Sequence, residues 1–213
     1  MDRAKELGLE QYFSINDQGK LVEQNEDIRQ GIMLDDLLRF HQREEDEYQF
    51  LKGFEAQISH ALALTAEAVH AIHQQSGSGI GEVLANDIVL KVEEGQIVGA
   101  RITLPDVAYR NEVEPLEQQA TDLADLCFSL GSAGFQVGGE ELARAHIQTV
   151  LENYDNDFVK TALKALVETR PHYGFITNRP RLGFDRVKNP KQTFEQVRAI
   201  VLETLNEKPS LPS

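Results

Sequence analysis

Hydrophobic and polar residues alternate with the period of a β-strand in two parts of the chain. Short apolar runs flank Asn16–Gly19, a pattern typical of a small hairpin that turns at glycine. Between residues 88 and 104, hydrophobic residues recur at every second position on either side of Glu94–Gly95. This second pattern predicts another hairpin, which must pair with further strands or lie on helices, because two strands alone are marginally stable in water.

Most of the remaining chain has a helical period, with hydrophobic residues three or four positions apart. One such stripe runs from Leu34 to Ile72 and contains Gly53, a residue type that destabilises a helix interior by about 1 kcal/mol relative to alanine. The stripe therefore predicts either one helix of about 40 residues or two helices that meet near Gly53. The glycine-rich stretch SGSGIG, residues 76–81, is expected to end this region.

Four further helices are predicted after the second hairpin, and glycines mark the limits of two of them. The first carries an apolar stripe that begins at Leu116, and Gly131 is expected to end it. The second follows the pair Gly138–Gly139 and has its own apolar stripe.

Capping residues mark the other two helices. The third helix is predicted to span Asp157–Thr169, with Asp155 or Asn156 as its N-terminal cap. For the last helix, Thr193 and Gln196 have the spacing of a capping box.

These elements predict an α+β fold that is mostly helical, with five or six helices and one or two small antiparallel β-hairpins. A boundary near SGSGIG would divide the chain into residues 1–75, with the N-terminal hairpin and the long amphipathic helical segment, and residues 76–213, with the second hairpin and the remaining helices. A single compact domain is equally compatible with the pattern.

The composition is typical of globular proteins and indicates where in the cell the protein is expected. Of its 213 residues, 41% are hydrophobic and 26% are charged, values close to the globular average. The single cysteine, Cys127, allows no intramolecular disulfide, and its place on an apolar stripe indicates core packing rather than nucleophilic chemistry. No apolar run approaches the roughly 20 residues of a membrane span, so we expect no membrane association and a cytoplasmic location.

The distribution of charge is more informative than the total. A net charge of −14 should repel phosphate backbones over most of the surface, which makes nucleic-acid binding unexpected. Residues 111–159 contain ten acidic side chains and one basic one, whereas residues 160–191 contain eight basic side chains and two acidic ones. Positive charge is therefore concentrated in one segment of an acidic protein.

That segment includes RPHYGFITNRPRLGFDR, residues 170–186, which we take as the candidate binding site. Guanidinium groups present planar donor pairs that suit carboxylate or phosphate, and Phe184 could form a wall of such a site. Three interpretations remain: the arginines pair with the chain's own carboxylates, they bind a small anion or nucleotide, or they dock an acidic partner. The candidate ligand-binding residues are Arg170, His172, Tyr173, Asn178, Arg179, Arg181 and Arg186.

Metal-ligating patterns are present only in fragments. Glu67 and His70 have the Glu-x-x-His spacing of di-iron helical bundles, and His41, Glu44 or Glu45 could add ligands, but no second copy of the motif occurs. His70 and His73 lie on one helical face and would need a third ligand to hold zinc. The sequence therefore predicts no metal site, and it identifies no cofactor.

The run GSGIG, residues 77–81, contains glycines that could surround a phosphate. A dinucleotide-binding loop, however, follows a strand and opens a helix, whereas this run follows a helix and precedes a strand. We therefore interpret the run as a connection between elements.

No catalytic constellation is visible in the sequence, so it is uncertain whether the protein is an enzyme. Two functions remain open. The first is a non-enzymatic protein-interaction or regulatory protein, since a long amphipathic helix suits a protein partner or self-association. The alternative is a small-anion ligand-binding protein or enzyme, acting on a phosphate- or carboxylate-bearing molecule through the arginine-rich segment 170–186.

Overall fold

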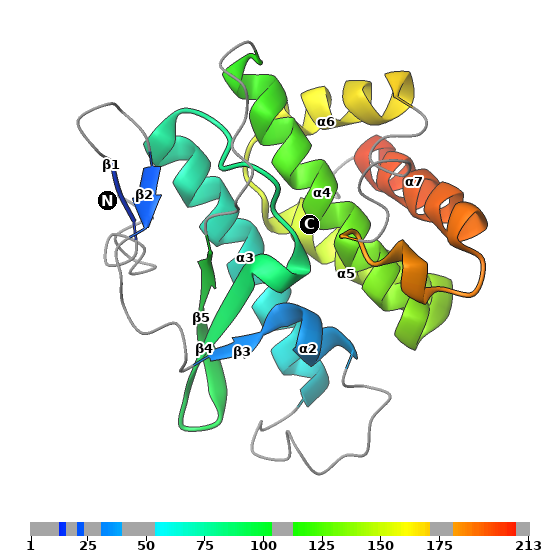
Figure 1. Cartoon of the computed structure of the whole chain (residues 1–213), viewed down its shortest axis with the longest axis horizontal. Helices are drawn as coiled ribbons and strands as arrows, with labels where there is room; N and C mark the ends of the chain where they lie inside the picture. Colours follow the sequence, from blue (N-terminus) through cyan, green and yellow to red (C-terminus); the bar gives the residue numbers. More distant parts are fainter. Residues whose placement is uncertain are drawn as a thin grey trace, which may run out of the picture.

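The computed structural model describes residues 13–15, 21–23, 31–39, 54–103, 113–170 and 181–207, and the structural statements below concern these residues. They form six α-helices, five β-strands and two short 3-10 helices (Figure 1). The predicted α+β, mostly helical fold is confirmed. None of the helices in these ranges combines the length and the apolar character needed to cross a membrane.

The N-terminal hairpin is confirmed as a pair of short antiparallel strands. Strand β1 (Phe13–Ile15) pairs with β2 (Leu21–Glu23), and Ser14 lies opposite Val22. The residues of the turn itself lie outside the described ranges.

The second predicted hairpin is confirmed and is part of a three-stranded antiparallel sheet of order β3-β4-β5. Its turn consists of Glu94 and Gly95, which both have positive φ angles, 51° and 78°. The third strand, β3, comes from earlier in the chain and pairs with β4. A strand of the predicted segment 1–75 therefore pairs with a strand of segment 76–213. The division of the chain into these two segments stays a prediction. The strands are β3 (Gly31–Met33), β4 (Ile88–Glu93) and β5 (Gln96–Ile102).

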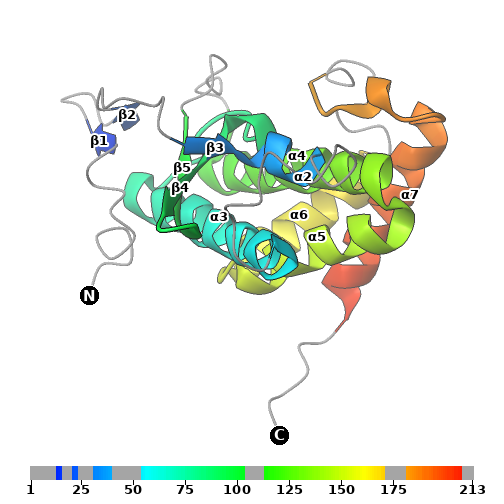
Figure 2. The ribbon, with the colours of Figure 1, turned by 90° about the horizontal axis from the view of Figure 1, so that it is seen from below.

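Two helices occupy the region of the first helical stripe. Helix α2 (Leu34–Arg39) directly follows β3, and α3 (Phe54–Ser76) ends at the glycine-rich connection as predicted. The residues between them, 40–53, lie outside the described ranges. Helix α3 packs along β5 on one side and along α5 on the other, so it joins the sheet to the remaining helices (Figures 1 and 2).

The C-terminal half contains four packed helices, with α4 in contact with α2, α5, α6 and α7. Every residue of α4 from Asp122 to Gly134 is buried. Because it is buried on all sides over this stretch, α4 lies inside the fold, between its neighbours (Figure 1). The four helices are α4 (Pro115–Val137), α5 (Gly139–Asn153), α6 (Asp157–Thr169) and α7 (Pro190–Asn206).

The predicted third helix of this half is confirmed with its cap. The side-chain Oδ1 of Asn156 accepts hydrogen bonds from the backbone N–H groups of Phe158, at 3.1 Å, and Val159, at 3.2 Å. These bonds satisfy donors that have no partner within the helix itself. Asn156, rather than Asp155, is therefore the N-terminal cap of α6.

Two predicted helix limits are wrong. Helix α4 does not end at Gly131 but continues to Val137. The glycine instead allows α7 to approach closely, since a Cβ atom at this position would lie 2.7 Å from Cγ1 of Val197. Helix α7 does not begin at the predicted capping box of Thr193 and Gln196. It begins at Pro190, whose fixed φ angle and missing N–H suit the first helical position.

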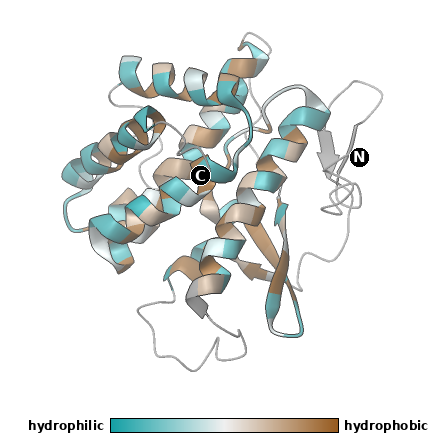
Figure 3. Ribbon diagram, turned by 180° about the vertical axis from the view of Figure 1, so that it is seen from behind, coloured by the Kyte–Doolittle hydropathy of each residue, from teal (hydrophilic) through white to brown (hydrophobic). Residues whose placement is uncertain are grey.

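The buried hydrophobic residues form one contiguous core that is shared by the sheet and the helices. Figure 3 shows hydrophobic colour on the three-stranded sheet and on the helix sides that face other elements, with hydrophilic colour outside. Aromatic rings join α4 to α7: Phe128 stacks on Phe194 with a centroid distance of 4.9 Å, and Phe184 contacts Phe194 edge-on at 5.5 Å. Phe184, proposed above as a pocket wall, is fully buried in this core.

Gly134 provides a test of the packing between α4 and α5. A Cβ atom at this position would lie 2.5 Å from Cα of Ala143, a backbone atom that cannot move without displacing α5. We predict that Gly134→Ala lowers the free energy of unfolding by about 1–3 kcal/mol, the usual effect of overpacking, although alanine is the better helix former by about 1 kcal/mol. Urea denaturation of the variant and the parent protein measures this difference.

The matched control is Gly99→Ala, because a Cβ atom at Gly99 would meet only Cβ of Lys91, at an ordinary contact distance of 3.9 Å. This control should leave stability within about 1 kcal/mol of the parent protein. A Gly134→Ala variant that is as stable as the parent would contradict the close approach of α4 and α5.

Candidate functional site

Two arginines of the predicted segment line a small pocket together with an arginine from α2. The pocket has a volume of about 90 Å³ and is lined by three arginines, Arg39, Arg181 and Arg186, but by one carboxylate, Asp35. We call this cavity the arginine pocket. Its remaining lining residues are Ala85, Asn86, Ser129, Leu182 and Gly183.

The position of Arg39 is fixed by hydrogen bonds at the end of α2. Its Nε donates to Oδ2 of Asp35, one helical turn earlier, at 2.6 Å. Its Nη1 donates to Oε1 of Gln136 on α4. The Nε2 of the same glutamine donates to the carbonyl oxygen of Gly183 at 3.0 Å, so Gln136 joins Arg39 to the turn that carries the other two arginines.

The turn at Gly183 requires glycine for two reasons. Its φ angle is 81°, in the left-handed region, and a Cβ atom would lie 3.0 Å from Nη2 of Arg39. The flanking residues Leu182 and Phe184 are buried and anchor the turn to the core. Arg181 and Arg186 are therefore held at the surface, with 46% and 61% of their side chains exposed.

Both surface arginines of the pocket also pair with carboxylates of the same chain. Arg181 forms an ion pair with Oε2 of Glu82. Nη1 of Arg186 lies 3.5 Å from Oδ2 of Asp35, the same oxygen that accepts from Arg39, so two guanidinium groups share one carboxylate. Glu82 is buried, and this burial raises the pKa of its carboxyl group, an effect that the nearby Arg181 opposes.

The remaining residues predicted for the site are only partly described. Arg170 does not line the arginine pocket; its Nη2 pairs with Oε1 of Glu117, at the start of α4, at 2.7 Å. The other four candidates, His172, Tyr173, Asn178 and Arg179, lie outside the described ranges.

Each described arginine of segment 170–186 thus faces a carboxylate of the same chain, as expected if the arginines neutralise the protein's own acidic groups. The pocket nevertheless has more guanidinium groups than carboxylates among its lining residues, as a bound anion would require. The sequence did not identify Arg39 or Gln136 as residues of the site. The one pattern that involves Arg39 is its spacing of four residues from Asp35, and no pattern in the sequence involves Gln136.

A second polar cluster is buried between α3 and α4. Nε2 of His73 lies 2.8 Å from Oδ2 of Asp122, and Nδ1 lies 2.7 Å from the hydroxyl oxygen of Tyr154. Nε2 donates to the carboxylate oxygen of Asp122, and Nδ1 forms the second hydrogen bond of the ring with the tyrosine hydroxyl. Burial, followed by the charge of Asp122, raises the pKa of Tyr154.

The glycine-rich connection completes this cluster. The backbone N–H groups of Ile80 and Gly81 donate to the two oxygens of Asp122 at 2.6 Å and 3.2 Å. The connection therefore surrounds a carboxylate of the chain itself. All three side chains of the cluster are buried, so it satisfies polar groups inside the core and is not exposed to a substrate.

The candidate metal ligands are not brought together within the described ranges. His73 uses both ring nitrogens in the cluster above, and His70, with its ring 5.1 Å from that of Tyr154, has a pKa lowered mainly by burial. His41, Glu44 and Glu45 lie outside the described ranges. Among the residues that the structure describes, no three His, Cys, Asp or Glu side chains form a group that could hold a metal ion.

Cys127 is fully buried in α4, as its place on the apolar stripe indicated. Burial raises the pKa of its thiol to about 12, so little thiolate is present at neutral pH. The cysteine is therefore a core residue rather than a nucleophile.

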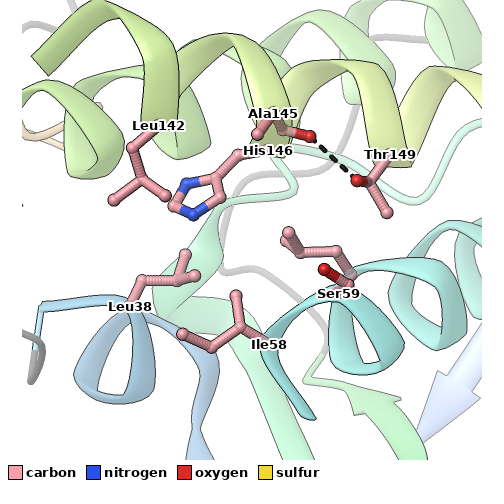
Figure 4. A pocket seen from close by; sticks show the side chains of 8 residues that line it. Leu38, Ile58, Ser59, Leu142, Ala145, His146 and Thr149 are labelled. Atoms are coloured by element: carbon pink, nitrogen blue, oxygen red, sulfur yellow. Dashed lines mark hydrogen bonds between the residues drawn. The ribbon is translucent and has the colours of Figure 1, made fainter. Parts of the chain in front are cut away.

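An apolar groove of about 210 Å³ lies between α2, α3 and α5 (Figure 4). Leu38, Ile58 and Leu142 line it, and the ring of His146 points into the space between these helices. The hydroxyl of Thr149 donates to the carbonyl oxygen of Ala145 at 2.8 Å, within its own helix. The groove can accommodate an apolar group, but it has no cluster of charged side chains that would select a ligand.

In comparisons with known proteins, no family model, no curated protein and no solved structure matches this chain.

Proposed function

We propose that this protein binds a small anionic ligand, with a phosphate or carboxylate group, in the arginine pocket. The observation that supports the proposal is the meeting of three guanidinium groups, from α2 and from residues 181–186, in a cavity with one lining carboxylate. On a protein with a net charge of −14, such a pocket is the exception to a surface that repels anions.

The two surface arginines can contact a ligand while they stay paired with the chain's own carboxylates. Arg181 and Arg186 are about half exposed, with 46% and 61% of their side chains accessible, and each guanidinium has five N–H donors, more than one carboxylate uses. A hydrogen bond to a charged ligand contributes about 1.5–3 kcal/mol, and each guanidinium can form two with one phosphate or carboxylate. An anion that contacts two or three of these arginines would therefore bind beside Asp35, through donors that the existing ion pairs leave free.

The interaction or regulatory function predicted from the sequence remains a second proposal, together with a protein partner or self-association and a cytoplasmic location. The observation that favours it is Phe158, which is 80% exposed in the first turn of α6. A large aromatic side chain on the surface is more typical of an interface than of free solvent-exposed surface.

We predict that inorganic phosphate binds to the protein and that Arg186→Ala weakens binding about tenfold, which corresponds to the loss of roughly 1.4 kcal/mol from one charged hydrogen bond. Isothermal titration calorimetry at constant ionic strength measures the affinity.

Glu82→Gln is expected to strengthen the binding of phosphate, because the amide leaves the guanidinium of Arg181 without a competing negative charge.

The matched control for the anion site is Arg144→Ala. Arg144 also pairs with carboxylates, those of Glu140 and Glu203, but it does not line the arginine pocket. Its loss should leave the affinity for phosphate unchanged. Equal weakening by both arginine variants, or no binding of phosphate and of simple carboxylates, would contradict the anion site.

For the second proposal, we predict that the protein self-associates through Phe158 and that Phe158→Ser shifts assembly to higher protein concentration. Light scattering over a concentration series measures the oligomeric state, with Val98→Ser, a substitution of an exposed residue in β5, as the control. A parent protein that stays monomeric throughout the series would rule out self-association through this residue.

A further inference from the structure

A second, larger cavity adjoins the arginine pocket. It has a volume of about 310 Å³ and lies where the 3-10 helix Phe184–Arg186 leads into α7. We call it the amide pocket, because side-chain amides predominate among its polar groups. Its lining residues are Phe135, Gln136, Arg186, Val187, Lys188, Asn189, Gln192, Thr193 and Gln196.

The two cavities are neighbours and have one lining residue in common, Arg186. Gln136 lines the amide pocket and, through its hydrogen bonds to Arg39 and to the carbonyl oxygen of Gly183, also holds the arginine pocket in place. A ligand whose anionic group contacts Arg186 can therefore place its remaining part in the amide pocket, beside α7.

The amide pocket has a chemistry different from that of its neighbour. Asn189, Gln192 and Gln196 follow one another at spacings of three and four residues, and Thr193 lies four residues after Asn189, so all four lie on one side of the start of α7. Each of the three amides carries donors and an acceptor, and the hydroxyl of the threonine can act as either. No carboxylate lines this cavity, and its charged groups are those of Arg186 and Lys188.

These features narrow the class of ligand. Groups that both donate and accept hydrogen bonds are complementary to sugar hydroxyls, which do the same. The side chains of Phe135 and Val187 add an apolar surface against which a sugar ring or a base can lie. A fatty acid would leave the amides without partners, and a single phosphate ion would leave the larger cavity unfilled.

We propose that the ligand is a phosphate ester of a sugar, either a free sugar phosphate or a nucleotide. Its phosphate lies against Arg39, Arg181 and Arg186, and its hydroxylated part lies against the amides of Gln192 and Gln196. This inference rests on the proposed function, because the phosphate end occupies the same arginine pocket.

The test is isothermal titration calorimetry of the full chain with inorganic phosphate, ribose 5-phosphate, adenosine monophosphate and ribose. We expect at least one of the two phosphate esters to bind about tenfold more tightly than inorganic phosphate, and ribose alone to show no binding, because added contacts in the amide pocket supplement the charge interaction. Tighter binding of the nucleotide than of ribose 5-phosphate would identify a nucleotide as the ligand, and the reverse a free sugar phosphate.

A double variant, Gln192→Ala with Gln196→Ala, separates the two ends of the site. It should weaken binding of the preferred phosphate ester about tenfold and leave the affinity for inorganic phosphate unchanged. Gln148→Ala, on the surface of α5 and outside both cavities, is the matched control and should change neither affinity. Thermal unfolding of each variant without ligand verifies that it is folded.

The outcomes distinguish this inference from the function on which it rests. If inorganic phosphate and both esters bind equally, and the double glutamine variant changes nothing, the sugar-phosphate assignment is overturned while the anion site stands. If none of the phosphates binds, the sugar-phosphate assignment is wrong, and if simple carboxylates do not bind either, the anion site is wrong as well.

Discussion

Hydrogen bonds to one buried carboxylate, that of Asp122, join three parts of the fold. The carboxylate of Asp122 has no exposure to solvent, and an unpaired charge in such a position would cost several kcal/mol. Three donors compensate it: Nε2 of His73 from α3, and the backbone N–H groups of Ile80 and Gly81 from the connection that follows α3. Through Tyr154, the same group of hydrogen bonds extends to the end of α5.

This constraint also positions the candidate site. Ile80 and Gly81 are held by Asp122 directly before Glu82, the residue whose carboxylate pairs with Arg181. Four residues further along the chain, the connection is fixed to α4 again, because the N–H of Ala85 donates to Oγ of Ser129 at 3.1 Å. Ala85 and Ser129 both line the arginine pocket. The buried cluster and the surface pocket are therefore joined by one short stretch of chain.

Local structure was predictable from the sequence where neighbouring residues determine it. The hairpin at Glu94–Gly95 and the capped helix Asp157–Thr169 follow from turn, period and capping signals within a few residues. Gly131 was misread because a glycine that ends a helix and a glycine that allows a neighbouring helix to approach look the same in one sequence. Thr193 was misread because the proline at position 190 starts the helix three residues earlier.

The site was predictable only in part, for the same reason. The clustering of Arg181 and Arg186 in an acidic chain directed attention to the segment they share. Arg39 and Gln136 meet them through tertiary packing, and no spacing in the sequence encodes this contact. The pairing of His73 with Asp122 was missed likewise, since the two residues lie on different helices and neither belongs to a recognisable motif.

Asp122, paired with His73 and the two backbone amides, holds the connection and the helices together. The most direct test is the free energy of unfolding of Asp122→Asn, measured by urea denaturation beside the parent protein. The substitution keeps the size of the side chain but replaces one acceptor with an N–H₂ group that faces donors, so a loss of about 3–5 kcal/mol is expected. A variant within about 1 kcal/mol of the parent would contradict the account.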